Sequence, residues 1–580
     1  MGILGFQKLQ EELDGGCIKL QMMERLREWK LEHPDEQAIV VIRLKELLIS
    51  VIQLNVKAAI FGGSHRYYHE QLEKFFQHFQ ALNVKLVFFG EGMKPSDKLL
   101  KYQAKIDQDY RKYNQLLKHI DKTNEVKTIS RPELRICLGL YEEGIARKYG
   151  EYILSTDLLN KDIVRYCLEN ANVVAILAKD SDFLLHNIKS VEYWSCGVEH
   201  LNFNDMTTLS FSKAALLDHL NLTPSQFHVM LAIAGVILDD CKKHRCFVSK
   251  DVLKEKRCAT GDIIKSVSDF VRDKLPETYE KPNFGEWATL TFTKHLEEYC
   301  WLIEKQYKKY DISSSNCLAS AADTNVCNKF KGIWAVVNNG VVRVNLNFLD
   351  LNKWQNNRNA MKFSNLVVLV LKRAMGVVLN AQKGERPKRR FFIKEYDGER
   401  CKMVAKSLTF APFEHPNIEE LLDESKSGDE ELTNMKWNLF FWTLHLDFDD
   451  DLKRKIRDLP KDILPVVVTV LFLLWENQIT PMEGDTIIIS ENEALNKEPS
   501  DGKVDYPTKP DGRTIRVAHI YVHTRVLINR CFQFCGIDLF NIPVLFDGID
   551  FHNLMDAFVQ NANEFENKKS QIAAFEVNAF

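Results

Sequence analysis

The first 240 residues alternate between short apolar runs and amphipathic stretches. Three runs of β-branched and aromatic residues are typical of buried strands, and they cover 38–42, 84–89 and 173–177. Four stretches with apolar residues at helical spacing or a polar, Lys-rich pattern predict helices, at 44–54, 68–82, 96–122 and 163–169. Strands that alternate with helices predict a parallel α/β sheet.

Beyond about residue 250 the alternation ends and the pattern becomes mostly helical. The most apolar run, Ile463 to Trp475, is too short to span a bilayer and predicts a core helix. Three polar or acidic segments, 310–328, 417–434 and 493–513, are expected to be loops or linkers. We therefore predict a domain at 1–245, a helical extension and linker at 246–330, and a mostly helical domain at 331–580.

Composition narrows the function classes. The chain has 580 residues, with 77 Lys and Arg against 80 Asp and Glu, which excludes a histone-like protein that coats nucleic acid. With 45% hydrophobic residues it can bury large cores, so global disorder is excluded. Its 13 cysteines are scattered and no signal peptide is evident, which indicates reduced thiols in the cytoplasm or nucleus.

Two motifs point to a family. The chain starts Met1-Gly-Ile-Leu-Gly-Phe6, and the third predicted strand ends in Asp180-Ser-Asp182, followed by Gly235-Val-Ile-Leu-Asp-Asp240. This order resembles the flap-endonuclease/XPG group of the PIN-like nucleases. The resemblance implies a PIN-like α/β fold, in which acidic residues at the carboxyl ends of parallel strands bind two divalent cations over a phosphodiester.

Most acids that this resemblance requires are missing. Arg43 follows the first strand where the family has Asp, and Gly90 takes the next acidic position, one residue before Glu91. The Glu-x-Glu position falls at Leu159 and Lys161, and the later Gly-x-Asp ends in Ile237. Only Asp180 and Asp182 match. Two carboxylates beside an arginine and a lysine are too few for two Mg²⁺ ions, so these two residues are either a loop cap or the remnant of one weak metal site.

The family's means of gripping duplex DNA is also missing. The segment Cys241 to Lys250 replaces its Gly-rich motif and contains no glycine. A non-catalytic branch fits better, on Leu86 to Gly92, Glu169 to Phe183 and Leu231 to Asp240. These residues resemble the family of the constitutive coactivator of peroxisome proliferator-activated receptor gamma, with asteroid and Mkt-type proteins as more distant relatives. The resemblance covers 1–245 and implies a scaffold that binds RNA and regulatory proteins.

Two basic clusters interleaved with aromatic residues are candidates for binding single-stranded RNA, whose phosphates meet cations and whose bases stack on rings. The first cluster comprises Lys383, Arg386, Lys388, Arg389, Arg390, Phe391 and Lys394. Gly384 and Pro387 favour a projecting loop over 383–396. The second cluster comprises Lys98, Lys101, Lys105, Arg111 and Lys112. The alternative for each is a solvated surface turn or helix face.

Two further strings have ordinary alternatives. Leu44-Lys-Glu-Leu-Leu48 matches the Leu-x-x-Leu-Leu pattern of nuclear-receptor ligands, but its position after the first strand predicts buried leucines. Two cysteine groups predict core or scattered thiols rather than zinc ligands, because their spacing lacks paired C-x₂-C motifs. They are Cys241, Cys246 and Cys258 around His244, and Cys531 with Cys535.

Three functions remain open at this point. The first is a non-catalytic nuclease-fold scaffold, without cofactor or membrane span, that binds RNA and regulatory proteins in the cytoplasm or nucleus. The second is a metal-dependent nuclease with a rearranged site. The third is a protein-interaction module without nucleic-acid contact. Metal-dependent cleavage would distinguish the nuclease from the non-catalytic scaffold. RNA crosslinking would distinguish the scaffold from a protein-interaction module.

Overall fold

The fold is given by a computed structural model of the whole chain. The structure describes residues 11–12, 15–90, 112–126, 139–155, 159–180, 183–184, 186, 188, 191–239, 260–275, 341–344, 362–378, 391–397, 402–408, 421, 429–496, 505–539 and 542–572. These residues fall into two compact units that interleave along the chain. Unit 1 takes segments 1–50, 75–91 and 149–320, and unit 2 takes 51–74, 92–148 and 321–580.

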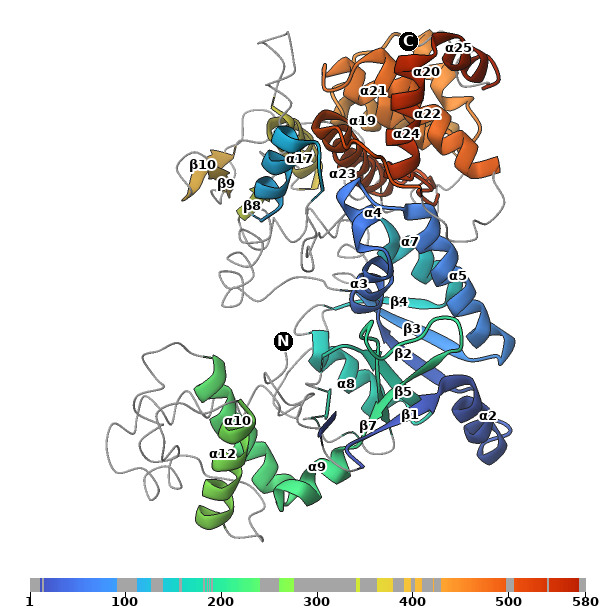
Figure 1. The fold of residues 1–580 in the computed structure, drawn as a ribbon. Coiled ribbons are helices and arrows are strands. Elements are labelled where there is room, and N and C mark those ends of the chain that lie inside the picture. Colours follow the sequence, from blue (N-terminus) through green and yellow to red (C-terminus); the bar gives the residue numbers. More distant parts are fainter. Residues whose placement is uncertain are drawn as a thin grey trace. The chain divides into compact units, whose positions relative to one another are not determined.

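Unit 1 contains a seven-stranded mixed sheet of order β1-β7-β6-β5-β2-β3-β4 (Figure 1). Its strands are β1 (Cys17–Gln21), β2 (Ile39–Arg43), β3 (Lys85–Gly90), β4 (Glu151–Leu154), β5 (Val173–Ala178), β6 (Glu192–Ser195) and β7 (Thr207–Phe211). The five strands from β6 to β4 run parallel, whereas β7 is antiparallel to both of its neighbours. The predicted parallel α/β sheet is therefore confirmed, with β7 and β1 added at one edge through antiparallel pairing.

Helices connect and cover these strands. They are α2 (Met22–Glu32), α3 (Leu44–Leu54), α5 (His65–Ala81), α8 (Leu159–Glu169), α9 (Lys213–Leu220), α10 (Pro224–Asp239) and α12 (Thr260–Lys274). Strand β5 is buried along its whole length, and Ile163, Val164 and Cys167 of α8 pack with it and with β2 and β3 in one core. Continuous burial explains why these strands read as unbroken apolar runs.

Unit 2 is mostly helical and includes two segments from the first half of the chain, 51–74 and 92–148. Its helices are α4 (Val56–Ile60), α7 (Gly139–Tyr149), α17 (Phe363–Val378), α19 (Glu430–Thr443), α20 (Asp450–Arg457), α21 (Leu464–Trp475), α22 (Pro481–Asn496), α23 (Gly512–Phe534), α24 (Gly548–Gln560) and α25 (Ala562–Lys569). Residues 112–123 are also helical, which confirms the described part of the helix predicted over 96–122.

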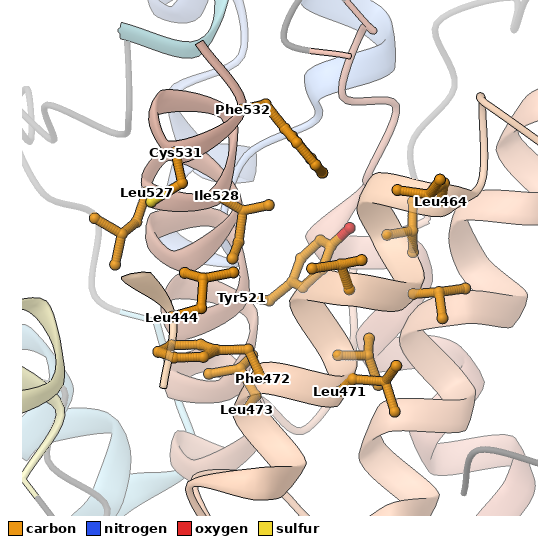
Figure 2. Packing of buried hydrophobic residues seen from close by; sticks show 14 of the residues in the cluster. Leu444, Leu464, Leu471, Phe472, Leu473, Tyr521, Leu527, Ile528, Cys531 and Phe532 are labelled. Atoms are coloured by element: carbon orange, nitrogen blue, oxygen red, sulfur yellow. The ribbon is translucent and has the colours of Figure 1, made fainter. Parts of the chain in front are cut away.

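Helix α21 is the centre of the unit 2 core. Its residues from Leu464 to Leu473 are all buried, and it packs against α22 and α23. Figure 2 shows Phe472 and Leu473 of α21 with Tyr521 and Phe532 of α23 in this cluster. The core helix predicted from the apolar run is confirmed, as is the burial of Cys531 and Cys535. In the described part of the chain, no helix is both long and apolar enough to cross a membrane.

The structure tests three expectations about loops and corrects two of them. Residues 391–396, expected in a projecting loop, lie in β9 (Phe391–Asp397), which pairs with β8 (Val341–Val344) and β10 (Lys402–Leu408). The acidic segment 417–434 is partly helical, because Asp429 caps α19 and accepts a hydrogen bond from the Glu431 amide. The segment 493–513 is a loop over 505–511, as predicted, and only its ends belong to helices α22 and α23. The domain boundaries at 245 and 330 stay a prediction.

Candidate functional site

Four parallel strands bring the residues of the expected nuclease centre to one edge of the sheet. Arg43 ends β2, Gly90 ends β3, Ser155 follows β4, and Asp180 comes two residues after β5. Arg43 is in register with Phe89, and Gly90 with Leu154. Because carboxyl ends of parallel strands meet at one edge, this is where α/β proteins place their ligand sites.

The guanidinium of Arg43 lies between two carboxylates. Its Nη1 is 2.9 Å from Oδ2 of Asp180 and 2.9 Å from Oε1 of Glu46. The side chains of Arg43 and Asp180 are only 12% and 3% exposed, so solvent screens this contact weakly. Asn160 of α8 donates a second hydrogen bond to Oδ2 of Asp180, at 3.1 Å.

Both carboxylate oxygens of Glu46 have protein partners. It lies in the first turn of α3, three residues after Arg43, and its Oε2 accepts a hydrogen bond from the Lys179 amide at 2.6 Å. Burial raises the pKa of Glu46, and the nearby charge of Asp180 raises it further, whereas Arg43 and the Lys179 amide lower it. The arginine therefore favours the ionised form of a carboxyl group that its surroundings would otherwise protonate.

Asp162 is an additional acid close to this edge, and it too has protein partners. Its Oδ2 accepts a hydrogen bond from the Ser155 hydroxyl at 2.6 Å, and its Oδ1 is 3.2 Å from Nη1 of Arg165. Asp162 is buried, so its oxygens face protein donors rather than solvent.

The Tyr152 side chain occupies the space next to Gly90. A Cβ placed on Gly90 would clash with the hydroxyl of Tyr152 on β4 and with its ring carbons. An aspartate at this position would require Tyr152 to move. The missing carboxylate is therefore built into the packing of the neighbouring strand as well as into the sequence.

The residues at this edge do not fit a pair of divalent cations. Two Mg²⁺ ions need several carboxylates that are free to bind them. Here one oxygen of Asp180 already accepts hydrogen bonds from Arg43 and Asn160. Among the described residues, no group of three His, Cys, Asp or Glu side chains has the arrangement of a metal site. Asp182, the second candidate, lies outside those residues.

Most predicted RNA-binding residues also lie outside the described ranges. These are Lys98, Lys101, Lys105, Arg111, Lys383, Arg386, Lys388, Arg389 and Arg390. Lys112 is exposed at the start of the helical residues 112–123, and Phe391 and Lys394 lie on β9. The leucines of the Leu-x-x-Leu-Leu string are buried, as predicted: Leu44, Leu47 and Leu48 are at most 2% exposed.

Sequence reasoning did not identify Glu46, Asn160 or Tyr193 as part of this edge. Tyr193 of β6 has a buried hydroxyl, and its pKa is raised well above the ordinary value by burial, then by the charge of Glu46. The one available signal was the closeness of Arg43 and Glu46 in sequence, at the junction of β2 and α3. Asn160 and Tyr193 reach the edge only through the tertiary fold.

Comparisons of sequence agree with the predicted resemblance. No protein-family model matches the chain. It is 23% identical over 222 residues to the human constitutive coactivator of peroxisome proliferator-activated receptor gamma, a match that covers 37% of this chain and 24% of that protein. The bovine protein of the same name is 21% identical over 265 residues, covering 45% of this chain and 37% of that protein. The matches thus span about a quarter to two fifths of these relatives.

Solved structures of nucleases show a weaker likeness. The catalytic core of Rad2 in complex with DNA substrate has a TM-score of 0.29 and 12% identity, covering 58% of this chain and 80% of that one. Human GEN1 in complex with Holliday junction DNA has a TM-score of 0.30 and 10% identity, covering 73% and 90%. Both scores are too low to establish a shared fold, so the fold class rests on the strand order and the helices of the chain itself.

Proposed function

We propose that this chain is a non-catalytic, PIN-like scaffold that binds RNA and regulatory proteins. The carrying observation is the Arg43 guanidinium, which lies 2.9 Å from both Asp180 and Glu46 at the edge where a nuclease would hold metal ions. A fixed organic cation neutralises carboxylate charge as a metal does, but it activates no water and binds no phosphate oxygen as a Lewis acid. The edge therefore keeps its structure without the chemistry of cleavage.

The first test of this proposal is cleavage. The purified chain should cut neither flap DNA nor single-stranded RNA in Mg²⁺ or Mn²⁺, because Arg43, Gly90 and Ile237 replace acids of a two-metal site. If cleavage is seen, it should be compared in the double variant Asp180→Asn, Asp182→Asn and in Asp205→Asn, a control at an exposed aspartate. Cleavage that is lost in the double variant and kept in the control would overturn the proposal.

The second test is RNA binding by the basic segment 383–396. Single-stranded RNA should bind in a salt-sensitive and sequence-tolerant way, with a slope of about −0.7 per phosphate contact. The triple variant Lys388→Ala, Arg389→Ala, Arg390→Ala should flatten that slope by two to three contacts' worth, about 2 in log–log units. Phe391→Ala should weaken RNA binding by about 1–3 kcal/mol if the Phe391 ring stacks on a base.

A matched control is available on α20. Lys453, Arg454 and Lys455 form an equally dense cation run, but each lies within 4 Å of Asp450 or Asp451. Replacing these three by Ala should leave RNA affinity and salt slope unchanged. Equal effects of the two triple variants would mean that only total charge matters, and no RNA binding at all would favour a protein-interaction module.

The regulatory role and cellular location of this scaffold are inferred from its relatives and belong to the same proposal. Proteins named as constitutive coactivators match 37% of the chain. We assign the chain to post-transcriptional regulation or to transcriptional coactivation, in the cytoplasm or nucleus. Crosslinking in cells followed by sequencing of bound RNA separates the two settings, since a coactivator without RNA contact would yield no enriched transcripts.

A further inference from the structure

Helix α25 docks on unit 2 without burying an apolar face of its own. None of its eight residues is buried, although it packs against α22 and α24. The ring of Phe565 lies 5.0 Å from that of Phe558 on α24, measured between their centres. Ile572, three residues after the helix, is buried. Because an isolated helix of this length is unstable in water, α25 depends on its docking to stay helical.

Two adjacent lysines of α25 pair with acids of α22. Nζ of Lys568 lies 2.6 Å from Oε1 of Glu493, and Nζ of Lys569 lies 2.6 Å from Oδ2 of Asp485. The side chains of the first pair are 30% and 28% exposed, so solvent weakens their attraction. The second pair is asymmetric, because Lys569 is 31% exposed and Asp485 only 4%. The cation of this pair is therefore at the surface, whereas the acid belongs to the body of unit 2.

Asp485 is a buried acid that α25 satisfies only in part. Its Oδ2 pairs with Lys569, whereas its Oδ1 is buried without a hydrogen-bond partner. Burial raises the pKa of Asp485 and Lys569 lowers it, so the ionised form depends on a cation at this place. A lysine ammonium meets a carboxylate as a point charge, whereas an arginine guanidinium donates to both oxygens at once. An arginine therefore suits Asp485 better than the lysine that α25 provides.

We propose that α25 covers a docking surface on α22 and α24 for a basic helix of a partner protein, which displaces α25 by placing an arginine on Asp485. The partner helix carries what α25 itself presents on one face: an aromatic ring at the position of Phe565 and cations three and four positions later. Displacement without a new cation is disfavoured, since it would leave Asp485 buried and unpaired. This inference rests on the protein-binding part of the proposed function and is independent of RNA binding.

The probe is a fluorescent peptide with the sequence of residues 561–572, in its native form and with Lys569→Arg. The full-length double variant Lys568→Glu, Lys569→Glu is the host, because its own α25 then faces the acids of α22 with like charge. We expect this variant to bind the native peptide at least about tenfold more tightly than the wild-type chain, whose own segment competes at high effective concentration. The Lys569→Arg peptide should bind the variant about threefold more tightly still, or better. Fluorescence anisotropy measures all of these affinities.

A matched control makes the same change of charge on α20. In the double variant Lys453→Glu, Lys455→Glu, the replaced lysines pair with Asp450 and Asp451 rather than with α22. This control should bind the peptide no better than the wild-type chain does. Equal affinity of the two double variants would refute the proposal, and so would a Lys569→Arg peptide that binds no more tightly than the native one.

Hydrogen exchange reports whether the host is folded and its α25 released. Exchange at 562–572 should be at least about tenfold faster in the Lys568→Glu, Lys569→Glu variant than in the wild type, with α21 unchanged. If α21 also loses protection, the neutral variant Lys568→Gln, Lys569→Gln becomes the host, with the same order of affinities expected. A wild-type dimer in which protection of 562–572 depends on protein concentration would assign the surface to a second copy and overturn the proposal. None of these outcomes bears on RNA binding or cleavage.

Discussion

Arg43 acts at the residue scale as an internal counter-ion. In a nuclease, bound metal ions would balance the carboxylates at this edge of the sheet. Here one planar guanidinium group balances them, and it contacts Glu46 and Asp180 together. Because these side chains are largely buried, removal of the arginine should lower stability mainly by leaving the two carboxylates without a counter-charge. Two carboxylates would then face each other with weak solvent screening.

We therefore expect Arg43→Met to destabilise unit 1 by about 3–5 kcal/mol, the range for breaking a buried ion pair from one side. Urea unfolding followed by tryptophan fluorescence measures the loss. Arg25→Met is the matched control, since Arg25 pairs with Glu28 and Glu192 at a more exposed site and should cost about 1 kcal/mol or less. Equal losses in the two variants would contradict the role given to Arg43.

A second prediction concerns the packing of Gly90 against Tyr152. Gly90→Ala should destabilise unit 1 by about 1–3 kcal/mol, because the new Cβ meets the Tyr152 hydroxyl and ring. Tyr152→Ala in the same chain should remove the clash, so the combined cost should be less than the sum of the single costs. A double-mutant cycle measures this coupling, and strict additivity would show that Tyr152 does not restrict position 90.

At the scale of elements, hydrophobic periodicity predicted those strands and helices whose pattern is set by burial of their own side chains. Strands β2, β3 and β5 were visible as apolar runs because both of their faces are covered. Strands β8 to β10 were missed because Lys383 to Tyr396 reads as a basic turn with Gly and Pro, and pairing with β8 is long-range. The absence of acids at the strand ends can be read from the sequence, but the side-chain partners of Asp180 come from β2 and α8, whose meeting depends on the fold.

The helical residues 112–123 show how a distant element is recruited. Asp121 accepts hydrogen bonds from both terminal nitrogens of Arg516 on α23, at 2.7 and 2.8 Å, and Tyr113 bonds to His519 one turn further along. Leu117 and Ile120 pack with Ile515 in the same cluster. This element is thus part of the unit 2 core, although it precedes α23 by about 400 positions in sequence.

Removal of the Asp121–Arg516 pair should therefore weaken unit 2. We expect Asp121→Ala to cost about 2–4 kcal/mol, because Arg516 is only 6% exposed and would keep a buried charge without this partner. Asp451→Ala, at an exposed ion pair on α20, should leave the melting temperature unchanged. Differential scanning calorimetry of both variants decides, and a neutral Asp121→Ala would mean that the pair contributes nothing to the docking of this helix.

At the scale of the whole unit, buried histidines link stability to pH. Nε2 of His519 lies 3.0 Å from the Ile60 carbonyl oxygen and within hydrogen-bond distance of the Tyr113 hydroxyl. Burial lowers the pKa of His519 to about 4, and it also lowers the pKa of His65 to about 4. Between pH 6.5 and 4 the unfolded chain binds protons that these folded histidines do not. Their contribution is therefore complete above pH 6.5 and declines as pH falls through this window.

The variant His519→Gln isolates one of these contributions. Glu491 and Asp547, whose pKa values burial raises, change stability in the opposite direction, so wild type and variant must be compared. The pH dependence of unfolding free energy should be flatter in the variant by up to about 1.4 kcal/mol per pH unit between pH 6.5 and 4. His78→Gln, at an exposed site, should follow the wild type. Parallel curves for wild type and His519→Gln would rule out His519 as a buried neutral residue.

Interleaving of the two units leads to the last prediction, which tests the domain boundary at residue 245. A fragment of residues 1–245 keeps all seven strands of the unit 1 sheet but lacks Ile515 and Ile549, which cover Phe61, Leu117 and Ile120 in the full chain. We expect this fragment to bind a hydrophobic dye and to lose protease protection over 112–123, since apolar surface left without partners becomes exposed. Leu117→Ala sharpens the test. In the full chain this substitution should lower the free energy of unfolding by about 2–5 kcal/mol, whereas in the fragment it should leave the free energy of unfolding unchanged. An equal cost in both would show that residues 112–123 pack within the first 245 residues, and the boundary would then divide two independent domains.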